Sequence, residues 1–151
     1  MKLTLLGTGC PSIDYKRCGS ANLIYSKKTK ILIDCGSGVT QRLNQSGHSS
    51  AEIDALLLTH LHTDHVIDLY QLIISSWHSD RDAIWKIYGP KGTKKFVDQI
   101  FLAWKNERKL RISYEKRKSI KALKYKVYEF NKTGSINIKD IKFKYFEVDH
   151  K

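Results

Sequence analysis

The stretch Thr59-His60-Leu61-His62-Thr63-Asp64-His65 places three imidazoles and a carboxylate within six residues. It directly follows the apolar run Ala55-Leu56-Leu57-Leu58, which is typical of a buried β-strand. In the loop after such a strand, the four polar side chains can converge on one point, which a regular helix or strand does not allow. Neutral imidazole and carboxylate groups suit zinc and similar divalent ions. The stretch therefore predicts a metal site; the alternative is a chance cluster of surface histidines.

The composition is typical of one ordinary folded domain. A length of 151 residues suits a single domain, and 41% hydrophobic with 28% charged residues is usual for a globular protein. The apolar run at the start is too short for a signal peptide, and no later run reaches membrane-spanning length. We therefore expect a cytoplasmic protein with no membrane partner. Because Cys10, Cys18 and Cys35 are odd in number and form no C-x-x-C pair, we expect reduced, mostly buried thiols.

The net charge of +12 is concentrated in one segment. Residues 105 to 126 contain ten Lys or Arg but only two acidic residues, Glu107 and Glu115, with aromatic residues such as Tyr114 interleaved. Such a segment can bind nucleic acid, with lysines on phosphates and rings stacked on bases. It can equally be a solvated basic face in a lysine-rich chain, and the sequence leaves both interpretations open.

The first two thirds of the chain alternate between strand and helix patterns. Predicted strands cover 2–6, 20–26, 30–34, 55–58 and 84–88, with a hairpin turn at 27–29; predicted helices cover 39–46, 66–77 and 93–104. Thr93 stands where it could cap the third helix, and Asp64 where it could cap the second. A cap and a metal ligand use the same carboxylate oxygens, and the adjacent histidines favour the ligand role for Asp64.

The last third alternates polar with apolar residues, which is typical of antiparallel strands. We expect strands at 124–130, 135–138 and 141–148, with a hairpin at Asn131-Lys132-Thr133-Gly134. His150 then stands at the end of a strand, as the other histidines do. It is a candidate fifth ligand, although a lone histidine at such a place usually has no function.

The metal stretch resembles the signature of the metallo-β-lactamase superfamily. Its flanks, Leu6-Gly7-Thr8-Gly9, 31–38 (ILIDCGSG) and Tyr88-Gly89-Pro90-Lys91-Gly92, resemble ribonuclease Z and its arylsulfatase-like relatives. The match follows the order of that group's N-terminal portion. The resemblance implies an αββα sandwich of which residues 1–151 form the N-terminal half to two thirds, with metals at the edge between the two sheets.

The resemblance also implies which residues form the site. Asp34 would orient the ligand loop through hydrogen bonds, and Arg17 would contact an anionic substrate; for Arg17 an ordinary surface arginine is the alternative. The implied ligands are His60, His62 and His150 for a first zinc ion, and Asp64 and His65 for a second.

The implied activity is that of a metal-dependent hydrolase. By this resemblance, two zinc ions would lower the pKa of a bound water, and the hydroxide so formed would attack the phosphodiester at the 3′ trailer of a precursor tRNA. Asp64 would hold metal and orient that water, manganese or iron could replace zinc, and relatives suggest a homodimer.

Two departures from the family pattern keep other functions open. The loop Arg17-Cys18-Gly19-Ser20 resembles the arylsulfatase-like branch, which favours a small-ester hydrolase as an alternative. The family's bridging Asp, a further His ligand and a proton-donating His would all lie beyond residue 151. We therefore expect a truncated domain with an incomplete site, for which a non-catalytic fragment that binds metal or RNA is a further alternative.

Overall fold

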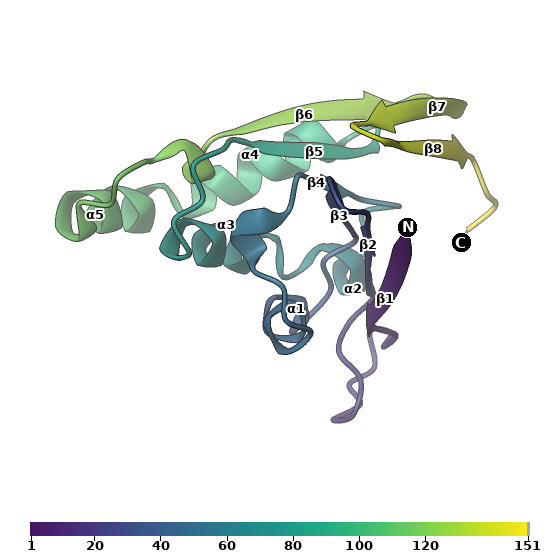
Figure 1. Cartoon of the computed structure of the whole chain (residues 1–151), viewed down its shortest axis with the longest axis horizontal. Helices are drawn as coiled ribbons and strands as arrows, with labels where there is room; N and C mark the ends of the chain where they lie inside the picture. Colours follow the sequence, from purple (N-terminus) through teal and green to yellow (C-terminus); the bar gives the residue numbers. More distant parts are fainter. Residues whose placement is uncertain (151) are drawn as a thin grey trace.

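The computed structural model describes residues 1–150 and contains a mixed sheet of six strands, against which the other elements pack (Figure 1). Its spatial order is β1-β2-β3-β4-β5-β6, and β7 and β8 form a separate two-stranded sheet. The strands are β1 (Lys2–Gly7), β2 (Ala21–Tyr25), β3 (Lys30–Ile33), β4 (Ala55–Leu57), β5 (Trp85–Pro90), β6 (Tyr125–Phe130), β7 (Thr133–Ile138) and β8 (Ile141–Phe146). The helices are α1 (Val39–Gln45), α2 (Thr63–Val66), α3 (Leu69–His78), α4 (Thr93–Ala103) and α5 (Lys105–Glu115), with short 3₁₀ turns at Ser50–Glu52 and Lys121–Leu123.

The two faces of the large sheet are covered by different structures. On one face, residues such as Leu23, Leu32 and Leu56 pack against apolar side chains of α1, α3 and α4. On the other face, Ile31, Ala55 and Leu57 pack against the β7–β8 hairpin. The resulting order of helices, sheet and second sheet agrees with the predicted αββα sandwich. None of the helices within residues 1–150 combines the length and the apolar character that crossing a membrane requires.

Strand direction determines where the site lies. β1, β2 and β3 pair antiparallel as expected from the 27–29 turn, whereas β3, β4, β5 and β6 run parallel. The carboxyl ends of β3, β4 and β5 therefore meet at one edge of the sheet, which is where α/β proteins commonly place their ligands.

The predicted hairpin at residues 131–134 is wrong. β6 joins the large sheet beside β5, and β7 begins the second sheet, so the chain changes sheets at this point. The hairpin lies instead between β7 and β8, where Lys139 adopts a left-handed φ of 53°. This turn lacks a favourable turn sequence and is stabilised by tertiary contacts instead: Asp140 accepts hydrogen bonds from the hydroxyls of Ser26 and Thr29.

The predicted helix at residues 66–77 is interrupted. α2 ends at Val66 and α3 begins at Leu69, because the amide of Asp68 donates to Cys35 O (3.0 Å) instead of continuing the helix. The Asp68 carboxylate accepts from the amide and hydroxyl of Thr40 at 2.8 and 2.7 Å. Hydrogen bonds from Asp68 to Cys35 and from Thr40 to Asp68 therefore divide the predicted helix in two.

The predicted caps and thiols also need correction. His62 is the N-cap of α2, with Asp64 in its first turn, and Gly92 rather than Thr93 is the N-cap of α4. Gly92 adopts a φ of 101°, which suits glycine, and the Thr93 hydroxyl donates to Pro90 O. Of the three free cysteines only Cys35 is buried, whereas the sequence suggested that most are.

Candidate metal centre

The ligand loop begins where β4 ends, in the middle of the large sheet. His60 and His62 lie in this loop, and Asp64 and His65 lie in the short helix α2 that follows. Asp34 approaches from the end of the neighbouring strand β3, and its amide donates to Leu57 O at 2.8 Å. Side chains from two adjacent parallel strands thus meet at one edge.

Three of the five predicted ligands come together in one group. One ring nitrogen from each of His60, His62 and His150 can be selected so that the three atoms lie within 4.8 Å of one another. The ring centroids of His60 and His62 are 4.6 Å apart, and those of His60 and His150 are 4.8 Å apart. His150 reaches the group from the segment after β8, so the site joins residues 90 positions apart in sequence.

The other two predicted ligands lie beside this group. The ring of His65 is 4.1 Å from that of His60, and its Nε2 is 3.5 Å from Asp64 Oδ2. Close backbone packing holds their helix, because an added Cβ on Gly36 would lie 2.0 Å from Asp64 O. Only glycine allows this approach, so Gly36 positions α2 and its two polar side chains.

Asp34 is a buried carboxylate with three hydrogen bonds into the ligand loop. It is 2% exposed and adopts a φ of 60°, in the left-handed region. Its oxygens accept from the amide of Thr59 at 2.8 Å, from the Thr59 hydroxyl at 2.8 Å and from His65 Nδ1 at 2.8 Å. Because a carboxylate can only accept, Nδ1 of His65 carries the proton, and Nε2 keeps the lone pair that a metal needs.

Thr59 sets the tautomer of His60 in the same way, a role that the sequence analysis did not predict. Its hydroxyl oxygen lies 3.0 Å from His60 Nδ1. Since the single hydroxyl proton is donated to Asp34, the oxygen must accept a hydrogen bond from the Nδ1–H of His60. The chain Asp34–Thr59–His60 therefore leaves the Nε2 lone pair of His60 available. A threonine between a strand and a histidine motif is too common to reveal this role in a single sequence.

The electrostatics of His60 agree with a ligand role. Burial, together with the neighbouring imidazoles of His65 and His62, lowers the pKa of His60, against the opposing effect of the Asp34 carboxylate. The ring is therefore neutral near pH 7, which is the form that binds metals. Among the described residues, Nε2 of His60 is a buried atom with no hydrogen-bond partner. A buried, neutral and unpartnered nitrogen facing two other imidazoles fits a divalent metal ion.

A cleft of about 1170 Å³ opens beside the histidines, between the ends of β4 and β5 and the β7–β8 hairpin. Lys91, Lys132 and Lys144 line it, and so do aromatic rings of which Phe130 and Tyr145 stack at 4.3 Å. Arg17 is not among its lining residues within the described chain; its side chain is 63% exposed and pairs with Asp14 at 3.7 Å. The role of Arg17 as a substrate contact thus stays a prediction, and the lysines are cationic groups that the sequence analysis missed.

Comparison with known proteins gives the family. The family described as "Anti-Pycsar protein Apyc1" matches residues 1–151. The chain belongs to this family. It also resembles the N-terminal portion of ribonuclease Z, as the sequence indicated: it is 38% identical over 117 residues to "Ribonuclease Z" of Mycobacterium marinum, covering 76% of this chain and 42% of the relative. The corresponding protein of Mycolicibacterium gilvum is 39% identical over 118 residues, covering 76% and 41%.

Solved structures show the metallo-β-lactamase fold for this member of the Apyc1 family. The short form of human tRNase Z superposes with a TM-score of 0.63 at 28% identity, covering 85% of this chain and 44% of the human one. YhfI of Bacillus subtilis, a metallo-β-lactamase fold protein, superposes with a TM-score of 0.64 at 20% identity, covering 90% and 47%. The chain thus spans less than half the length of the ribonuclease Z relatives that it matches.

Proposed function

We propose that the protein is a zinc-dependent phosphodiesterase of the ribonuclease Z type, which removes 3′ trailers from precursor tRNA. One observation carries the proposal. Nε2 of His60 is buried without a hydrogen-bond partner and lies near His62 and His150. Asp34 and Thr59 keep the ring proton on Nδ1, so the lone pair of Nε2 is free to bind a metal. Such preparation of a nitrogen is useful for holding a metal and has no evident value for packing.

Each predicted ligand has a role in this proposal. His60, His62 and His150 would hold one ion, and His65 with Asp64 would hold the second. Bound zinc would supply an activated water and positive charge for the reacting phosphodiester. Asp64, beside Nε2 of His65, would orient that water, and Asp34 would keep both His60 and His65 in the required tautomer.

The cleft supports an anionic substrate. Lys91, Lys132 and Lys144 place ammonium groups along its walls, where they can contact phosphates. The choice of precursor tRNA rests on relatives named ribonuclease Z and on human tRNase Z. A cytoplasmic location belongs to the same proposal, because precursor tRNA is an intracellular substrate; a homodimer stays a prediction.

A second candidate is the role named by the family, action against Pycsar. The match over residues 1–151 favours it, because the ribonuclease Z relatives match only 76% of the chain. Separately, the Arg17-Cys18-Gly19-Ser20 loop favours a small-ester hydrolase that would use the same metal centre.

Activity assays separate these candidates. The product of the complete reading frame, loaded with zinc, is incubated with 3′-extended precursor tRNA, bis(p-nitrophenyl) phosphate and p-nitrophenyl sulfate. We expect removal of the tRNA trailer, and loss of that activity in Asp64→Ala with an unchanged thermal melt. Turnover of the small phosphodiester without tRNA cleavage would contradict the first candidate and select a small-ester hydrolase, and turnover of the sulfate alone selects an arylsulfatase-like enzyme. Zinc binding without any turnover leaves a non-catalytic metal-binding protein.

A further inference from the structure

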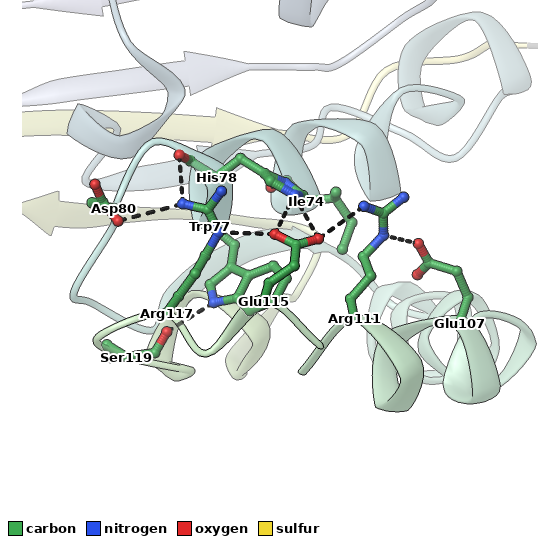
Figure 2. Close-up of polar contacts among 9 residues, drawn as sticks. All are labelled: Ile74, Trp77, His78, Asp80, Glu107, Arg111, Glu115, Arg117 and Ser119. Atoms are coloured by element: carbon green, nitrogen blue, oxygen red, sulfur yellow. Dashed lines mark hydrogen bonds and ion pairs between the residues drawn. The ribbon is translucent and has the colours of Figure 1, made fainter. Parts of the chain in front are cut away.

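The helix α5 contacts the rest of the protein through charged side chains (Figure 2). Glu107, Arg111 and Glu115 repeat every four residues and so lie along one side of the helix. Arg111 pairs with both glutamates, and Glu115 pairs with His78 of α3 at 2.9 Å. None of the side chains of α5 is buried. Both carboxylates of the basic segment 105–126 are thus engaged in ion pairs within the protein.

The opposite side of α5 carries basic and polar residues together with the partly exposed Ile112. Lys105, Lys109 and Ser113 also repeat every four residues, and helix geometry places them roughly 200° around the axis from the charged contact side. All three are exposed. Among the described residues, no carboxylate lies within ion-pair distance of Lys105 or Lys109. Their positive charge therefore faces solvent.

Two exposed aromatic rings belong to the same segment but lie off its basic side, since helix geometry places Tyr114 roughly 140° around the axis from Lys109. Tyr114 is 78% exposed, and Trp104, immediately before α5, is 47% exposed. One face of the Trp104 ring stacks on Tyr70, with centroids 5.0 Å apart and an interplanar angle of 10°. Exposed rings of this kind can stack on nucleobases.

We propose that the α5 arm, defined as residues 104–118, is a binding site for single-stranded RNA that is separate from the metal centre. Lys105 and Lys109 contact phosphates, with Lys116 and Lys118 extending the basic surface beyond the helix. Tyr114 and Trp104 provide ring faces for bases. This inference goes beyond the proposed function and does not depend on it.

The arrangement favours RNA over other acidic partners. A helix that lies on a membrane presents one continuous apolar side to the lipid. The exposed aliphatic residues of α5, Leu110 and Ile112, are two positions apart and so lie on nearly opposite sides of the helix. A second copy of the chain would bring two basic helices together, which like charges oppose. A flexible single strand with stackable bases can reach both the lysines and the rings, because the helix that separates them is only about 10 Å across.

The arm lies at the opposite end of the molecule from the β7–β8 hairpin and the C-terminal segment that carries His150 (Figure 1). The length of the molecule therefore separates this surface from the candidate metal centre. A long RNA can occupy both places, whereas a small ester can occupy only the cleft. The α5 arm would thus distinguish polymeric from small substrates.

Fluorescence anisotropy tests the proposal. The probe is a labelled oligouridine RNA of about 20 nucleotides, titrated with the full chain in EDTA at about 0.1 M KCl. The variant K105Q/K109Q is compared with K27Q/K28Q, which removes the same charge from two exposed lysines in the β2–β3 turn. We expect K105Q/K109Q to raise Kd about tenfold and to reduce the salt slope of log K by about 1.4, with the control within about twofold of the unchanged chain. Tyr114→Ala should weaken binding by about tenfold as well.

Circular dichroism melts of all variants establish that each remains folded. Equal weakening by both lysine pairs would overturn the proposal, because it would indicate general attraction to the net charge. Absence of RNA binding would overturn it too. So would binding of phosphatidylserine vesicles that K105Q/K109Q abolishes while RNA binding is unaffected, which would assign the arm to a membrane surface.

Discussion

At the carboxyl ends of β3 and β4, the buried carboxylate of Asp34 accepts hydrogen bonds from Thr59 and His65, whereas the α5 arm is held to α3 by ion pairs near the surface (Figure 2). Asp34 is 2% exposed and accepts from Thr59 and His65. Arg111 and Glu115, in contrast, retain 40% and 26% exposure of their side chains. Both regions contain charges, but the carboxylate of Asp34 is shielded from water, whereas the charged groups of α5 are not.

This difference determines how much each interaction contributes. A buried hydrogen bond to a carboxylate cannot be replaced by water, so its loss affects both stability and the ligand that it orients. Exposed ion pairs are weakened by solvent and salt, and each contributes little. We therefore expect precise, costly positioning at the metal centre and a weakly held arm at α5. Four predictions test this contrast, in order of decreasing effect.

The largest effect is expected for Asp34→Asn. The amide group would place a donor where His65 Nδ1 now donates, which favours the wrong tautomer of His65. Zinc affinity, measured by isothermal titration calorimetry, should fall about 10- to 100-fold, and the free energy of unfolding by about 2 kcal/mol. Asp68→Asn is the matched control: it disturbs a carboxylate bound to Thr40 and should retain zinc affinity. Equal zinc affinity in both variants would contradict the role of Asp34.

A smaller effect is expected for Thr59→Val, which keeps the side-chain shape but removes the hydroxyl. The Nδ1–H of His60 then loses its acceptor, so the ring can take either tautomer and the lone pair is no longer kept on Nε2. Zinc affinity should fall about tenfold by calorimetry. Thr59→Ser restores the hydroxyl and should restore the affinity; failure of this rescue would show that the methyl group matters and not the hydrogen bond.

Arg111→Gln should have little effect on global stability. It removes both ion pairs to Glu107 and Glu115, yet the free energy of unfolding should change by less than about 1 kcal/mol. Amide hydrogen exchange in residues 105–115 should become faster, while exchange in β3 and β4 stays unchanged. A loss of several kcal/mol would contradict the contrast, because it would make the arm part of the core.

The smallest effect concerns Tyr70, which donates to Glu107 at 3.0 Å and so joins α3 to α5. Burial and the Glu107 carboxylate raise the pKa of Tyr70 to about 12, against the opposing effect of Arg108. Because the pKa in the folded state is raised, this contact is fully present below pH 10 and is lost as the pH rises from 10 to 12. Difference absorbance near 295 nm between the unchanged chain and Tyr70→Phe should show this late titration. Ionisation of Tyr70 near pH 10 would indicate that the contact does not form.

The parts of the fold that the sequence predicted have strong local patterns. The apolar run before His60 predicted the central strand, and the 27–29 turn predicted the β2–β3 hairpin. Asp34 could be singled out because it ends a strand beside glycines, but its partners could not. They depend on the pairing of β3 with β4, which places residues 34 and 59 together.

The errors arose where tertiary contacts override local pattern. The helix at 66–77 divides because Asp68 bonds to Cys35 and Thr40, residues from another part of the chain. No local pattern marks the change of sheet after Phe130, since β6 and β7 each alternate as ordinary strands. The helix α5 was not predicted because its contact side is formed by charges, so it lacks the apolar stripe that identifies most helices.

The most direct test of the metal centre is anomalous diffraction at the zinc edge from crystals of the chain grown with zinc. We predict a peak within bonding distance of His60 Nε2, with His62 and His150 as further ligands. Zinc peaks only at places away from His60, His62 and His150, or an intact histidine group that remains empty in saturating zinc, would contradict the assignment of these histidines as ligands.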